Sequence, residues 1–277
     1  MNPGGAIADA APLPTQPAAI GRNGLDGATM FARYAYPPNE LGYCGPDDHA
    51  ALLQYAAAGV VDPGLGQLAR GFAGAWPYLE LIAGSTHIGH PLDRRVVEAY
   101  WLGSSLLERI DMHDFGNSLF ERFRSRAGAG WSSLAEAIPV GALPTHSFHV
   151  FGVYPWVGLL RGERSEQPLH VLERCRIRWG KVLTVDGDQA VVASQPLTWD
   201  GTRLALGEYR PETVTRGLDG RGLAAEIAPG DWVSMHWGWV CERLSRRQLS
   251  NLRRYSLLEL DVTNRRVSRP GAAVVLS

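Results

Sequence analysis

The sequence predicts an α+β fold, in which an N-terminal α-helical domain is followed by a small antiparallel β-barrel with a C-terminal helix. Apolar residues recur at helical spacing over residues 25–160. Short runs rich in Val, Ile and Trp, separated by turn dipeptides, occupy residues 169–277. The polar, turn-prone segment 161–168 lies between the two patterns, so we interpret it as a linker.

Composition narrows the classes of protein to consider. The net charge is -1, which gives no indication of a nucleic-acid or membrane surface. Residues 1–24 are rich in Ala, Pro and Gly and lack a basic start, so we expect a disordered leader and not a secretion signal. No apolar run approaches the roughly 20 residues of a membrane helix. Three cysteines argue against a disulfide framework, and we expect a cytoplasmic protein.

Five helices are expected in the N-terminal half. They cover residues 50–56, 65–83, 93–110, 114–126 and 131–138. Asp47 or Asp48 can cap the first helix, and Pro77 is expected to break the second. The third has the clearest apolar face. This half is therefore predicted to have a core of its own.

Turn residues divide the C-terminal third into strands. Asp186-Gly187 separates residues 174–183 from 189–192, and Pro229-Gly230 precedes a strand over 231–240. Ser245 can cap a helix over 246–258. The pattern predicts a small antiparallel β-barrel (OB-like) with a C-terminal helix.

Alternation along these strands predicts where two donor side chains lie. Cys175 would share one strand face with Ile177 and Trp179. The other face would carry three arginines and form a basic edge for a partner or an anionic metal group; they are Arg174, Arg176 and Arg178. His236 would point away from the most apolar face of its strand, so we expect it to be accessible.

Three motifs occur in a fixed order before the last helix. They are Cys175-x-x-x-x-Gly180-Lys181-Val182, then Asp186-Gly187-Asp188-x-Ala190-x-Val192, then Gly230-Asp231-Trp232-Val233-x-x-His236-x-Gly238-Trp239. This order resembles the HypC/HupF family of [NiFe]-hydrogenase assembly chaperones. Members of that family begin with Met-Cys, whereas Cys175 lies deep inside this chain.

The resemblance implies a function and a site. Cys175 and His236 would transiently hold iron as the Fe(CN)2(CO) unit. The partners would be a HypD-like scaffold protein and the hydrogenase large subunit. A thiolate and a neutral imidazole are suitable donors for such iron, and an incomplete donor set suits a carrier that must release its metal. A structural zinc site would need four protein ligands.

Further donors gather at the ends of the expected helices. They are Cys44, His49, His87, His90, His113, His146 and His149. Two His-x-x-His spacings would suit a second iron or another transition metal if the loops converge. Capping and hydrogen-bonding histidines are an equally weighted interpretation. Cys241 is expected to be structural.

We therefore expect a HypC-like maturation chaperone that carries or docks the iron unit and is not itself an enzyme. The alternative is a metal-dependent enzyme, in which the helical domain makes or delivers a diatomic ligand, CO, for the same cofactor. A third interpretation is a chaperone that recognises the large subunit without any metal.

Overall fold

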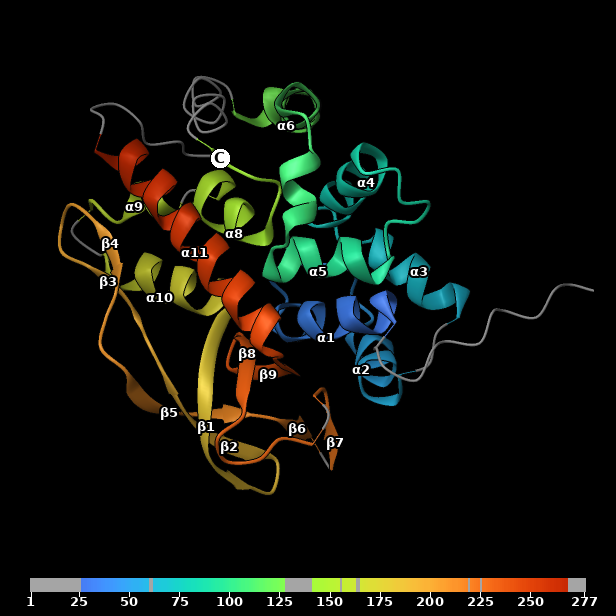
Figure 1. Ribbon diagram of the computed structural model, residues 1–277, viewed down its shortest axis with the longest axis vertical. Coiled ribbons are helices and arrows are strands. Elements are labelled where there is room, and N and C mark those ends of the chain that lie inside the picture. The colour runs from blue at the N-terminus through green and yellow to red at the C-terminus, as the bar shows by residue number, and fades with distance from the viewer. Residues whose placement is uncertain are drawn as a thin grey trace, which may run out of the picture.

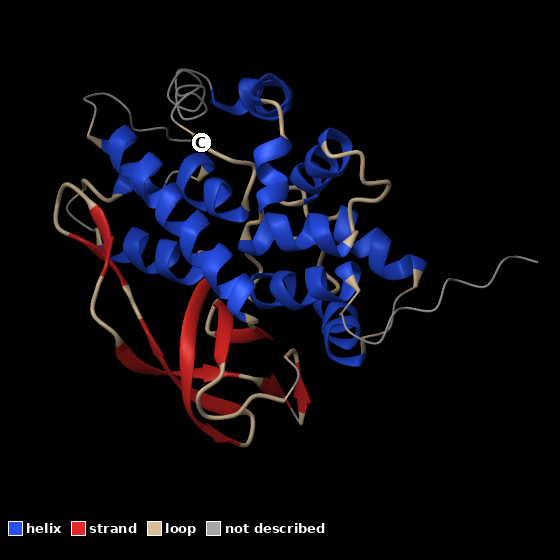
Figure 2. Cartoon of the chain, in the orientation of Figure 1, coloured by secondary structure: helices blue, strands red, loops and turns tan. Residues whose placement is uncertain are grey.

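The computed structural model describes residues 26–59, 62–127, 141–154, 156–162, 165–218, 220–224 and 226–268. It confirms the α+β class: helices form the N-terminal part, a mixed sheet of five strands follows, and a long helix comes last (Figure 1). The helices gather on one side of the molecule and the strands on the other (Figure 2). The expected leader 1–24 and helix 131–138 lie outside the described residues.

The helical part begins with a helix that the sequence pattern did not suggest. The helices before the sheet are α1 (Gly27–Glu40), α2 (His49–Ala58), α3 (Pro63–Arg70), α4 (Trp76–Ser85), α5 (Arg94–Leu102), α6 (Met112–Ala127), α8 (His146–Phe148), α9 (Trp156–Leu159) and α10 (Glu166–Cys175). A 3-10 turn, η1 (Ser105–Arg109), follows α5, and a π-helical turn, η3 (His149–Val153), follows α8. The first three residues of α10, 166–168, belonged to the expected linker, whose role as a domain boundary stays a prediction.

Local capping rules place several helix ends. Asp48 accepts a hydrogen bond from the Ala51 N–H at 3.1 Å, which confirms the predicted cap of α2. Pro77 lies in the first turn of α4, where a missing N–H costs nothing, so the break falls before it. The expected helix over 93–110 ends early because Gly103 adopts φ 80° and ψ 149°.

The five strands of the main sheet close on themselves in the order β1-β2-β5-β9-β8. They are β1 (Arg178–Asp186), β2 (Gln189–Ser194), β5 (Arg210–Thr215), β8 (Trp232–His236) and β9 (Trp239–Arg243). The predicted sheet was wholly antiparallel, but β5 and β9 pair in parallel through Thr215 and Trp239, so the sheet is mixed. Two small hairpins lie outside it: β3 (Leu197–Trp199) with β4 (Leu204–Leu206), and β6 (Gly217–Leu218) with β7 (Arg221–Gly222).

The first expected strand starts later than predicted. Helix α10 continues to Cys175, and β1 begins only at Arg178, so Cys175 does not share a strand face with Trp179. The predicted basic edge is wrong as well, because Arg174 lies in α10 and the other two arginines are buried. Arg176 and Arg178 are buried and form ion pairs with Glu173 at 2.9 and 3.1 Å, because a buried guanidinium requires an acceptor.

One hydrophobic cluster joins the helical part to the sheet. It contains Phe31 and Tyr34 of α1 together with Ile177 before β1 and Trp239 of β9. A separate cluster, formed by side chains such as Val192, packs within the closed sheet. The helical part therefore shares buried surface with the sheet, and α1 contacts β8 and β9 directly.

The last helix, α11 (Arg246–Val267), packs against α5 and η3. The Ser245 side chain accepts from the Gln248 N–H at 3.2 Å, while the Ser245 N–H donates to the Gln248 side chain at 3.0 Å. This capping box confirms the predicted cap. The helix extends nine residues beyond the expected end at Leu258, to Val267. Within the described residues, no helix has both the length and the apolarity to cross a bilayer.

Candidate metal centre

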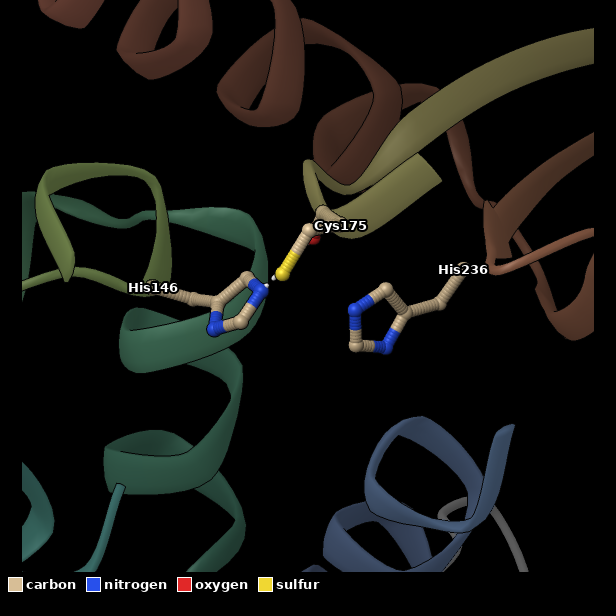
Figure 3. A group of neighbouring side chains, drawn as sticks. All are labelled: His146, Cys175 and His236. Atoms are coloured by element: carbon tan, nitrogen blue, oxygen red, sulfur yellow. Dashed lines mark hydrogen bonds between the residues drawn. The ribbon is translucent and has the colours of Figure 1, made fainter. Parts of the chain in front are cut away.

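Three donor side chains from separate elements meet beside the sheet. His146 begins α8, Cys175 ends α10 and His236 ends β8. One ligand atom from each lies within 4.8 Å of the other two. Figure 3 shows the thiol of Cys175 and the two imidazole rings turned toward a common point. The predicted pair Cys175 and His236 is thus brought together, and His146 joins it.

Cys175 is placed by the end of its helix. The next residue, Arg176, leaves the helical conformation with φ -66° and ψ 145° and leads into β1. Burial raises the pKa of the Cys175 thiol to about 12. The thiol is therefore protonated at neutral pH, and a metal would have to displace this proton to bind.

His236 is fully buried, so its predicted accessibility is wrong. The two residues after it, Trp237 and Gly238, have φ 49° and 83° and form the tight turn between β8 and β9. Helix α1 covers this side of the sheet, and His236 Nδ1 lies 2.6 Å from the Tyr34 main-chain oxygen. Since a carbonyl only accepts, Nδ1 carries the proton. The other nitrogen, Nε2, makes no hydrogen bond of normal geometry, although the Cys175 main chain lies near it.

The environment keeps both histidines neutral. Burial lowers the pKa of His146 to about 4. Burial, reinforced by the neighbouring His146, holds the pKa of His236 well below its usual value. His146 Nε2 lies 2.8 Å from the Cys175 carbonyl oxygen, and its Nδ1 lies 3.4 Å from the Tyr100 hydroxyl. In this arrangement His146 donates through Nε2 and accepts through Nδ1.

A cavity of about 220 Å³ opens beside the three donors. Its walls are mainly aromatic and aliphatic side chains, among them Phe72, Tyr154 and Trp156. The Tyr43 ring, itself 55% exposed, stacks on Trp237 with centroids 4.2 Å apart. A metal held by the three donors would face a small, largely apolar space.

Two more of the predicted donors line this cavity. Cys44 is partly buried, and burial raises the pKa of its thiol to about 12. His149 lies with Nδ1 3.3 Å from the Tyr78 hydroxyl. Neither belongs to the close group of three. Cys241 is buried in β9, away from the cavity walls.

The remaining predicted donors lie apart from this centre. All are exposed, and none belongs to the group of three: His49, His87, His90 and His113. The His90 ring accepts from the Leu92 N–H at 3.0 Å, as a hydrogen-bonding histidine at a loop end does. Metal binding by these four residues stays a prediction.

The sequence interpretation missed the residues that hold the two histidines. Tyr34 acts through its main-chain oxygen, and nothing in a side chain's identity reveals such a role. Helix α1, which places Tyr34, could have been found from Asp26, whose side chain accepts from the Ala28 N–H at 3.3 Å. Tyr100 is a buried core residue, and its hydroxyl lies 3.4 Å from His146 Nδ1.

Comparison with known families adds one finding. The model of a family of unknown function, DUF6390, matches residues 23–270. The chain belongs to this family. The DUF6390 match spans the helical part, the sheet and the last helix, so all three donors lie within it. Searches of curated proteins and of solved structures gave no match.

Proposed function

We propose that this DUF6390 member is a HypC-like chaperone in [NiFe]-hydrogenase maturation. It would carry or dock the Fe(CN)2(CO) unit between a HypD-like scaffold protein and the hydrogenase large subunit. One observation carries the proposal. Cys175 and His236, which the motif resemblance pairs as iron ligands, lie within 4.8 Å through their ligand atoms although they belong to different elements.

The state of the two donors supports the proposal. The His236 imidazole is neutral, and its unprotonated Nε2 is buried and makes no hydrogen bond of normal geometry. Its other nitrogen is held by the Tyr34 carbonyl, the arrangement that orients metal-binding histidines in many proteins. The Cys175 thiol supplies a soft donor once its proton is displaced. These two donors leave most positions of an iron ion open for other ligands.

The cavity also suits the proposed cargo. Carbon monoxide is small and nearly apolar, and most of the residues that line the cavity are apolar as well. Two indole N–H groups among the lining residues, those of Trp101 and Trp237, make no hydrogen bond of normal geometry. The Trp237 indole lies near the Cys175 thiol and lowers its pKa, against the larger effect of burial. The terminal nitrogen of an iron-bound cyanide is a hydrogen-bond acceptor, and it could accept from these indole N–H groups.

The alternative of catalysis by a metal site within residues 25–160 has less support. In the part of the chain that the structure describes, the group of three donors takes Cys175 and His236 from outside that range. Free thiols at all three cysteines are compatible with the cytoplasm as the compartment.

The test is co-expression with a HypD-like scaffold protein, followed by anaerobic purification and infrared spectroscopy. The wild-type protein is expected to show cyanide and carbonyl bands together with bound iron. Cys175→Ala and His236→Ala should lose the bands. Cys241→Ala is the matched control, because it removes a thiol outside the cavity, and it should keep them. Unchanged bands in Cys175→Ala would reject the proposal.

A further inference from the structure

The strongest unassigned feature is the position of His146 in the group of three. It comes from the helical part of the chain, whereas the motif resemblance covers only residues after it. Its ring centroid lies 5.0 Å from that of His236, with the rings 78° apart. In Figure 3 the two imidazoles flank the Cys175 thiol from opposite sides. This is a placement from which both rings can reach one ion.

We infer that His146 is a third protein ligand, so that Cys175, His236 and His146 form a built divalent-metal site with at least one position open to the cavity. The inference deepens the proposed function and rests on it for the identity of the cargo. Two nitrogens and one sulfur suit the borderline ions Fe²⁺, Co²⁺ and Zn²⁺. Three protein ligands with an open fourth position are the pattern of sites that exchange or react with a further ligand.

An independent observation points to a ligand at this place. His236 is 0% exposed, and its Nε2 is a buried polar atom that makes no hydrogen bond of normal geometry, although the Cys175 main chain lies near the ring. Leaving such an atom unpaired costs free energy, which a bound ion would offset. In Figure 3 a ring nitrogen of His236 faces His146 and Cys175, while the Tyr34 carbonyl accounts for Nδ1.

Metal binding requires a change of tautomer at His146. Without metal its Nε2–H donates to the Cys175 carbonyl oxygen, 2.8 Å away. To coordinate through Nε2, the ring must carry its proton on Nδ1, where the Tyr100 oxygen at 3.4 Å can accept it. The proton balance is then simple: the thiol proton of Cys175 goes to solvent, the metal–sulfur bond replaces the S–H bond, and His146 moves its proton without losing it.

A first experiment titrates the full-length, metal-free protein with Co²⁺ under anaerobic conditions. The wild type is expected to bind one ion, with a thiolate-to-cobalt charge-transfer band and intense visible bands of a low-coordinate site. His146→Ala should keep the thiolate band, bind at least about 10-fold more weakly and lose visible intensity. His170→Ala is the control, because His170 is exposed on α10, the helix that carries Cys175. Unchanged affinity and spectrum in His146→Ala would overturn the inference.

A second measurement needs no variant and stands even if His146→Ala fails to fold. Nitrogen-15 spectra of the wild-type histidines, recorded with and without Zn²⁺, report which ring nitrogen carries hydrogen. His146 should change from Nε2–H to Nδ1–H with the metal on Nε2. Retention of Nε2–H in the zinc-bound protein would exclude His146 as an Nε2 ligand.

The two proposals fail separately. If Cys175→Ala and His236→Ala lose cobalt while His146→Ala binds it normally, the two-ligand carrier survives and the third ligand does not. If His146 binds metal but the co-purified protein shows no cyanide or carbonyl bands, the metal site stands and the hydrogenase assignment is rejected.

Discussion

The main-chain oxygen of Tyr34 lies 2.6 Å from His236 Nδ1 and thereby determines which nitrogen of that ring is free. A residue of α1 thus fixes the tautomer of a histidine that lies at the end of β8. The same packing buries the imidazole completely. The chemical state of the centre therefore depends on contacts between parts of the chain that are distant in sequence.

Burial of two neutral histidines predicts acid sensitivity of the metal-free protein. The folded-state pKa of His146, about 4, lies below its ordinary value of 6.5, so the unfolded chain binds more protons between these values. Stability is then present above about pH 6.5 and is lost as the pH falls. The loss from His146 alone should be roughly 2 kcal/mol at pH 5. Urea unfolding at pH 7.5, 6 and 5 measures it.

A matched pair of variants separates this effect from general acid unfolding. His146→Phe should lose less stability than the wild type between pH 7.5 and 5. His170→Ala, which alters an exposed ring, should follow the wild type. Identical pH profiles for all three proteins would contradict the prediction.

The stack of Tyr43 on Trp237 predicts a role in retaining metal. Tyr43 is more than half exposed, so Tyr43→Ala should cost less than about 1 kcal/mol of unfolding free energy. Its loss uncovers Trp237 at the cavity wall, and Co²⁺ should pass to a competing chelator several-fold faster. Stopped-flow absorbance measures the transfer. Tyr209→Ala, at an exposed tyrosine outside the cavity walls, should leave the rate unchanged; equal rates in both variants would refute this role.

The contact between Gly103 and Tyr255 predicts a strongly destabilising substitution. A Cβ at Gly103 would lie 2.1 Å from a Tyr255 ring carbon, and its φ of 80° disfavours any side chain. Gly103→Ala should therefore cost about 3 kcal/mol or more. Gly201→Ala is the control, since Gly201 also has positive φ but open space around it, and it should cost about 1 kcal/mol. Denaturant unfolding measures the free energy lost by each variant. Equal losses in the two variants would contradict the prediction, because they would mean that Tyr255 moves aside at little cost.

The capping box at α11 predicts a moderate effect. Ser245→Ala removes the acceptor for the Gln248 N–H and should cost about 1 kcal/mol. Ser250→Ala, on the exposed face of the same helix, should cost little. Thermal unfolding of the two variants tests the difference, and equal melting temperatures would count against the cap.

Local rules predicted the local features well. The caps Asp48 and Ser245 follow from short-range hydrogen bonds, which the sequence specifies within three residues. The proximity of Cys175 and His236 followed from the motif resemblance. By contrast, the strand face proposed for Cys175 was wrong because an alternating pattern after a helix does not show where the helix ends.

Tertiary packing explains what the sequence could not show. Alternation indicates which strand face a side chain occupies but not what covers that face, and α1 covers His236. His146 was considered for a second metal site through its His-x-x-His spacing with His149, because a three-residue separation is visible in a sequence and a contact with Cys175 is not. The two histidines differ in position. His146 belongs to the group of three, whereas His149 lines the cavity without belonging to that group.

The buried cluster that joins Phe31 and Tyr34 to Ile177 and Trp239 means that the helical part and the sheet each cover apolar surface of the other. A fragment that ends at residue 160 would expose apolar side chains that now pack against the sheet. A fragment that starts there would lack α1 and the Tyr34 carbonyl that orients His236. Either half transplanted alone into another protein would carry only some of the side chains of the proposed metal site.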